Sequence, residues 1–132
     1  MEPDAIRDVL TGLLDDSGAA WTSAAGHICF RLAKDGAAWQ VACRCIPGRL
    51  LVYSRWPFAV EDAEDARRQC CEINAQLVQG AVYLPPDGQP VCRTDAALPD
   101  AYDAALHIRE AIEYNAAAVC RFWQKFLPGP TL

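Results

Sequence analysis

The sequence predicts an α+β domain with a mainly antiparallel sheet, and three features support this prediction. Short alternating apolar segments follow one another across tight turns between residues 27 and 56. Segments with helical apolar spacing flank them, without the regular alternation of strand and helix that a parallel sheet requires. The length of 132 residues is usual for one domain. We predict the order helix, three strands, helix, two strands, helix, with a core over about residues 4–127 and a short tail at 128–132.

The first predicted helix covers residues 4–15. Its apolar side chains recur three and four residues apart, as one buried face of a helix requires. Asp4 is the expected N-cap, and Gly18 is the expected terminator.

Three strands are predicted over residues 27–32, 38–46 and 50–56. Each alternates apolar and polar side chains, which is typical of a half-buried antiparallel strand. The turns Asp35-Gly36 and Pro47-Gly48 separate them, and Asp-Gly is a strong hairpin signal. The three strands therefore form a meander.

A second helix is predicted over residues 61–79, with acidic residues in its first turn, where they suit the helix dipole, and Gly80 as its stop. A second hairpin follows, from strands 81–84 and 91–94. The last helix begins at Asp100 as N-cap and runs to about Leu127, where the Pro128-Gly129-Pro130 sequence ends it.

The overall charge argues against two classes of partner. The chain has 12 Lys and Arg against 17 Asp and Glu, a net charge of −5. Nucleic-acid binding draws most of its affinity from basic side chains that neutralise phosphates. No stretch approaches the roughly 20 apolar residues of a membrane span, and the first ten residues do not resemble a signal peptide. We therefore expect a soluble, cytoplasmic chain that binds neither nucleic acid nor membrane.

Signals for catalysis are weak. The seven cysteines lack the C-x2-C spacing of structural zinc and are expected to be buried apolar side chains. His27 and His107 are isolated, and no nucleotide-binding, hydrolase or metalloprotease motif occurs. We predict no catalytic residue, no metal site and no cofactor. A small enzyme that pairs a cysteine with one histidine is kept as an alternative.

A candidate binding surface follows from the two-residue period of the meander. If the apolar side of each strand faces the core, each strand places one arginine on the opposite face. Arginine and tyrosine are common anchors at protein interfaces. We predict that this face binds a protein partner, although a merely solvated sheet face would carry similar residues. The predicted partner-binding residues are Arg31, Arg44, Leu51, Tyr53 and Arg55.

The last helix is a second candidate surface, because its apolar residues cover more than one narrow stripe. Such a helix is usually buried on several sides, and a second subunit is one source of cover. We predict a homodimer or partner contact through Phe122, Trp123 and Phe126.

The element order resembles the YbjN family of bacterial proteins, described as candidate sensory-transduction regulators. The strongest matching segment is residues 73–83, with Asn74 near the end of the second helix and Gly80 before a strand that carries an aromatic residue. The Asp87-Gly88 turn, residues 91–94 and residues 39–53 continue the pattern. The resemblance implies the fold of type III secretion chaperones and a non-enzymatic regulatory or protein-binding role. A chaperone that binds an effector segment is the other reading of this fold.

Overall fold

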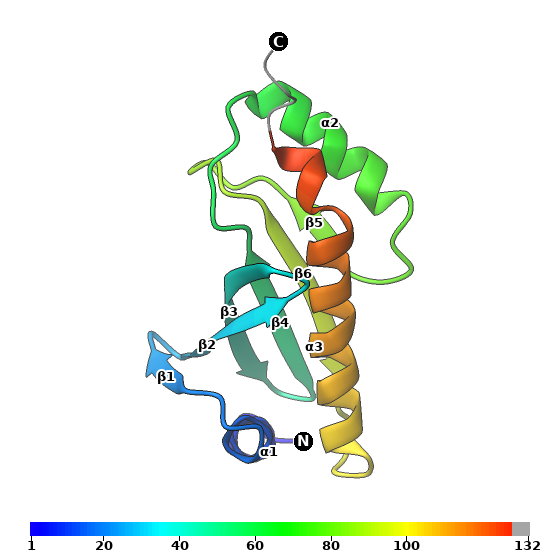
Figure 1. Ribbon diagram of the computed structural model, residues 1–132. Coiled ribbons are helices and arrows are strands. Elements are labelled where there is room, and N and C mark those ends of the chain that lie inside the picture. Colours follow the sequence, from blue (N-terminus) through cyan, green and yellow to red (C-terminus); the bar gives the residue numbers. More distant parts are fainter. Residues whose placement is uncertain (128–132) are drawn as a thin grey trace.

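The computed structural model describes residues 1–127 and confirms the α+β class (Figure 1). Six strands form one antiparallel sheet in the order β1-β2-β3-β4-β6-β5. The predicted tail, 128–132, lies outside the described residues. The elements in chain order are α1 (Pro3–Asp16), β1 (Trp21–Ala24), β2 (His27–Lys34), β3 (Ala37–Ile46), β4 (Arg49–Arg55), α2 (Ala63–Asn74), β5 (Ala81–Tyr83), β6 (Val91–Ala97), α3 (Ala104–Arg121) and the 3₁₀ turn η1 (Trp123–Phe126).

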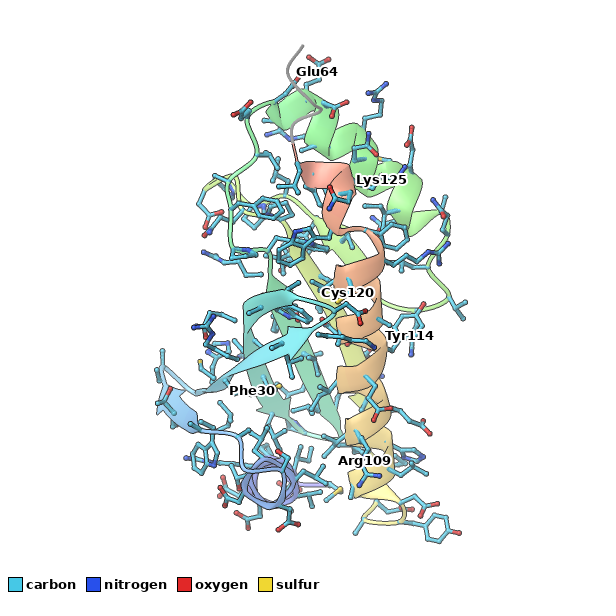
Figure 2. All side chains as sticks on the ribbon, in the orientation of Figure 1. Phe30, Glu64, Arg109, Tyr114, Cys120 and Lys125 are labelled. Atoms are coloured by element: carbon cyan, nitrogen blue, oxygen red, sulfur yellow. The ribbon has the colours of Figure 1, made fainter. Side chains whose placement is uncertain are left out.

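The core lies between the sheet and the helices. Helix α3 packs along β6 and β4, α1 packs against α3 and β3, and α2 packs against β5 and η1. The side chains between α3 and the sheet fill this space (Figure 2). Trp39 on β3 is buried there, and its indole N–H donates to Ser54 Oγ at 2.9 Å.

The predicted meander is confirmed as β2, β3 and β4, and the predicted hairpin as β5 and β6. Strand β1, which pairs with β2 at the sheet edge, was not predicted. Its four residues, WTSA, show no burial alternation because three of them are exposed. A strand this short and polar has little periodicity in its sequence.

Both predicted N-caps, Asp4 and Asp100, need correction. In α1 the N-cap position is Glu2, with Pro3 as the first helical residue, and Asp4 lies inside the first turn. In α3 the N-cap position is Asp103, while the Asp100 carboxylate accepts from the Tyr102 backbone N–H at 2.9 Å in the preceding turn.

Helix α2 is shorter than predicted at both ends. Asp62 stands before the helix and its carboxylate accepts from the Asp65 N–H at 3.0 Å, so Asp62 is a side-chain N-cap. The helix ends at Asn74, and the loop beyond it is held by α3. The backbone N–H of Val78 donates to the Tyr114 hydroxyl at 3.0 Å, and Figure 2 shows Tyr114 directed toward this loop.

The last helix also ends early, at Arg121, and η1 follows it. The aromatic rings of this turn pack against Trp39 on β3 and against aromatic residues of the segment that follows β4. The Phe126 ring meets Trp56 edge-on at 5.1 Å between centroids, and Trp123 meets Phe58 at 5.5 Å. None of the helices described in residues 1–127 has both the length and the apolar composition that a membrane span requires.

Candidate functional site: an open face of the sheet

One face of the sheet carries none of the helices. Along β2, Ile28 and Phe30 are buried under the helices, whereas Cys29 is half-buried and Arg31 is exposed. The same alternation runs along β3 and β4, where Leu50 and Val52 face the core. The helix-free side is called the open sheet face below.

The strand register arranges the open sheet face into rows, because directly paired residues of antiparallel strands point to the same side. Three rows cross the meander and continue onto β6. The rows are His27, Arg44, Leu51 and Asp95; Cys29, Ala42, Tyr53 and Arg93; and Arg31, Gln40, Arg55 and Val91.

All five predicted partner-binding residues therefore lie on one face. Arg31, Arg44 and Arg55 are exposed, whereas Leu51 and Tyr53 are half-buried between their neighbours. The arrangement expected from the two-residue period is present.

Residues that the sequence reasoning missed extend this face. Arg93 lies beside Tyr53 and Arg49 begins the outward series of β4, while Tyr83 on β5 pairs with Val91. The signal was available in the alternation of residues 91–95, but using it required the pairing of β4 with β6. That pairing joins strands separated by α2 and β5, and local periodicity does not determine it.

Two of the five arginines on the open sheet face are paired with carboxylates. Arg55 contacts Asp87 at 2.9 Å and donates to the Gln89 amide oxygen at 2.8 Å. Arg49 forms an ion pair with Asp95. In the described part of the chain, the remaining three arginines of the face make no ion pair: Arg31, Arg44 and Arg93.

A shallow hollow of about 440 Å³ lies on the open sheet face. Its lining is mainly apolar carbon from the five strands β2 to β6 and from the loop after β5, and it includes Cys29, Ala42, Tyr53, Tyr83 and Pro85. Burial raises the pKa of Tyr83, and the neighbouring Tyr53 raises it further against the opposite effect of two nearby arginines. The Tyr83 hydroxyl is thus neutral at physiological pH and suits hydrogen bonding rather than proton transfer.

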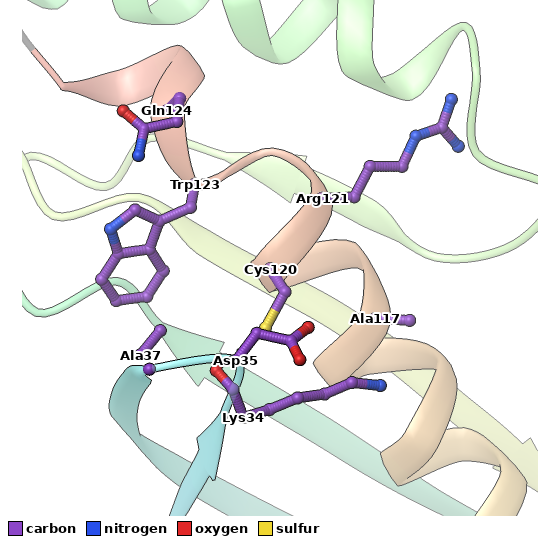
Figure 3. A pocket seen from close by; sticks show the side chains of 9 residues that line it. Lys34, Asp35, Ala37, Ala117, Cys120, Arg121, Trp123 and Gln124 are labelled. Atoms are coloured by element: carbon purple, nitrogen blue, oxygen red, sulfur yellow. Dashed lines mark hydrogen bonds between the residues drawn. The ribbon is translucent and has the colours of Figure 1, made fainter.

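A second hollow of about 570 Å³ lies between the β2–β3 turn and the end of α3 (Figure 3). Lys34, Asp35, Cys120 and Trp123 line it, with the Cys120 thiol 3.7 Å from the Lys34 carbonyl oxygen. Burial raises the Cys120 pKa, and nearby Asp35 adds to this. A protonated thiol beside mixed charges does not form a recognisable reactive centre.

The structure corrects the predicted partner surface on the last helix. Phe122 and Phe126 are buried in the chain's own core, and Trp123 is half-buried against Trp39 and Phe58. Much of the breadth of this apolar region is explained by the bend into η1, which turns the rings onto the sheet. The prediction of a homodimer rested on these rings, and their burial removes that support. Homodimerisation itself stays a prediction.

The resolved pKa shifts of the thiols run against thiolate formation. Every resolved pKa shift of a cysteine is upward, with burial as the largest cause. His27 lines the apolar hollow near Cys29, while the side chain of His107 is exposed on α3. Over residues 1–127, no group of three or more His, Cys, Asp or Glu side chains is placed to hold a metal ion.

These features define a class: a small α+β domain with helices on one side of an antiparallel sheet and an arginine-rich, partly apolar face on the other. No family model and no curated protein sequence matches the chain. Among solved structures, it is similar to the crystal structure of YbjN from E. coli, described there as a candidate transcription regulator. The TM-score is 0.66 at 17% identity, covering 92% of this chain and 95% of that one. The fold expected from the sequence is thereby confirmed.

Proposed function

We propose that this chain is a non-enzymatic protein-binding module of a regulatory kind, and that it binds through the open sheet face. The single observation that carries the proposal is the gathering of Leu51, Tyr53 and Tyr83 with unpaired arginines on a sheet face that no helix covers. Such mixed aromatic, aliphatic and arginine surfaces match the composition of protein interfaces.

Two further observations support a binding role over catalysis. The raised thiol pKa values disfavour the thiolate that a cysteine enzyme needs. The fold is shared with YbjN, whose description is regulatory, and regulation by contact requires no reactive group. Fold likeness alone does not transfer a function, so the face carries the proposal.

The test compares two variants that remove the same side chains from different surfaces. Leu51→Ser/Tyr53→Ser alters the open sheet face, and Tyr102→Ser/Leu106→Ser alters one exposed residue in the turn before α3 and one in its first turn. Each tagged protein is used to capture proteins from an extract of the native host, with identification by mass spectrometry. We expect at least one protein to bind the unaltered chain and the α3 variant but not the sheet variant.

Circular dichroism and thermal melting establish that both variants fold. Equal capture by the sheet variant would contradict the proposal. Loss of capture in the α3 variant alone would move the interface to Tyr102 and Leu106.

A further inference from the structure

The open sheet face differs in charge from the rest of the molecule. Its outward side chains, Arg49 at the start of β4 included, together with the carboxylate bonded to Arg55, contain five arginines and two aspartates, which leaves a net charge of +3. The whole chain carries −5, so the remainder carries −8. The arginines are Arg31, Arg44, Arg49, Arg55 and Arg93, and the aspartates are Asp87 and Asp95.

The arginines without an ion-pair partner say more about a binding partner than the net charge of the face does. Asp87 and Asp95 engage Arg55 and Arg49, whereas Arg31, Arg44 and Arg93 have no ion-pair partner in residues 1–127. Paired rows place Arg44 and Arg93 on different strands around Tyr53 and Ala42. The unpaired arginines therefore lie on the strands beside the apolar hollow, whose own lining contains the paired Arg55. Unpaired guanidinium groups bind carboxylates through paired N–H donors.

The hollow at this centre supplies the second half of the recognition. It has a mainly apolar lining and a volume of about 440 Å³. One aliphatic or aromatic side chain would bury apolar area there, while carboxylates beside it reach the arginines. Resting on the proposed function, we propose that the partner is an acidic peptide segment that places an apolar anchor residue between Asp or Glu side chains.

Charge and geometry disfavour two other occupants of this face, a second copy of the chain and a nucleic acid. A second copy of this chain docked face to face would bring two surfaces of net +3 together, which opposes association. A nucleic acid gains affinity by neutralising many phosphates. Here Arg49 and Arg55 are occupied by aspartates, and Tyr53 is half-buried between strands rather than presented as a stacking platform.

The experiment selects random dodecapeptides displayed on phage against the intact chain. Selection is repeated with Arg44→Glu/Arg93→Glu, which reverses two unpaired charges on the open sheet face. The matched control is Arg67→Glu/Arg109→Glu, the same charge change on exposed positions of α2 and α3, the latter shown in Figure 2. A synthesised peptide from the winning pool is then measured by fluorescence anisotropy at low and high salt.

We expect the enriched peptides to combine Asp or Glu with Leu, Phe, Tyr or Trp. The Arg44→Glu/Arg93→Glu protein should bind these peptides at least about tenfold more weakly than the unaltered chain, and the control variant should bind them less than about twofold more weakly. Added salt should also weaken binding to the unaltered chain. Enriched peptides that need Leu51 and Tyr53 but show no acidic bias would overturn this inference and leave the proposed function standing. If no peptide depends on the open sheet face, both fail. A single-stranded oligothymidylate that binds and displaces the peptide would replace the peptide partner by nucleic acid.

Discussion

At the scale of single residues, Asn115 is the most constrained polar group of the core. It is fully buried on α3, and its side-chain nitrogen lies 3.1 Å from each of three acceptors. The acceptors are the carbonyl oxygens of Val52 and Cys92 and the hydroxyl oxygen of Thr94. That hydroxyl donates its own proton to the Ala111 carbonyl at 2.9 Å, so it is free to accept from Asn115. The amide thereby ties α3 to both β4 and β6.

Asn115→Asp should make stability depend on pH. The new carboxylate would be buried beside two carbonyl oxygens and a hydroxyl whose proton is given to Ala111, so its folded pKa should rise far above the unfolded value of about 3.9. The folded state then keeps a proton that the unfolded state loses. The free energy of unfolding should fall relative to the unaltered chain as pH rises above about 4, by about 1.4 kcal/mol per pH unit.

Urea unfolding at pH 5 and pH 7 measures this effect, with Asn115→Leu as the control that has no titrating group. We expect the Asp variant to lose about 2 kcal/mol or more between the two pH values, relative to the unaltered chain. An equal loss at both pH values would show that the carboxyl is solvated and that the site is not closed.

Gly80 illustrates a backbone constraint. It has a φ of +82°, and an added Cβ would overlap the Arg93 carbonyl oxygen and approach Thr94 Cγ2 to 3.1 Å. Gly36 has a similar φ of +80° but open space around it. We predict that Gly80→Ala costs about 2–4 kcal/mol and Gly36→Ala about 1 kcal/mol. Chemical denaturation compares them, and equal costs would mean that β6 yields to the added methyl group.

At the scale of elements, β5 depends on a side chain from α2. Its three residues form an edge strand. The Asn74 amide donates to the Val82 carbonyl at 3.0 Å, and the Val82 N–H donates to the Asn74 side-chain oxygen at 2.7 Å. One amide group thus satisfies both outward-facing backbone groups of Val82, as a neighbouring strand would.

Hydrogen exchange at the Val82 amide should report this contact directly. Asn74→Ala removes the acceptor, so Val82 exchange should accelerate by about tenfold or more if the lost bond is worth about 1.4 kcal/mol. Asn74→Asp keeps an oxygen acceptor and should retain most of the protection. Acceleration of equal size in both variants would show that the effect comes from general loosening of α2.

Sequence patterns predicted the elements best where periodicity is long and turns are explicit. The meander was found because each strand alternates and Gly36 and Gly48 mark its turns. The ends of α2 and α3 were misplaced because tertiary contacts determine them. Tyr114 holds the loop after α2, and the packing of Phe126 on Trp56 accompanies the bend after α3. The place of Arg93 on the open sheet face was missed for the same reason, because its neighbour Tyr53 belongs to a strand that is adjacent in the sheet but distant in the sequence.

At the scale of the whole molecule, the one-sided layering separates stability from surface chemistry. The helices and the inward side chains of the sheet form the core, so the outward rows are free to carry charge. Concentrating net positive charge on one face of an acidic chain gives the molecule a directional field. Such a field raises association rates with a partner of opposite charge and weakens with salt.

The same layering accounts for the behaviour expected of the thiols. Cys70, on the buried side of α2, has its pKa raised to about 11, and Cys92, on the inner side of β6, has its pKa raised to about 12, both mainly by burial. A raised pKa means that less thiolate is present at neutral pH. Alkylation at pH 7 should therefore be slower at both positions than in the unfolded chain, by about a hundredfold for Cys70 from the thiolate fraction alone.

Iodoacetamide labelling at pH 7 and pH 9, followed by mass spectrometry of each cysteine, tests this expectation against a urea-unfolded reference. Cys71 is exposed and is the internal control that should react readily in the folded protein. Labelling of Cys70 should still increase about tenfold per pH unit at pH 9, because its pKa lies above that range. If any thiol reacts faster in the folded chain than in the unfolded one at pH 7, the fold must be stabilising its thiolate. That cysteine would be a candidate nucleophile, and the non-enzymatic proposal would be wrong.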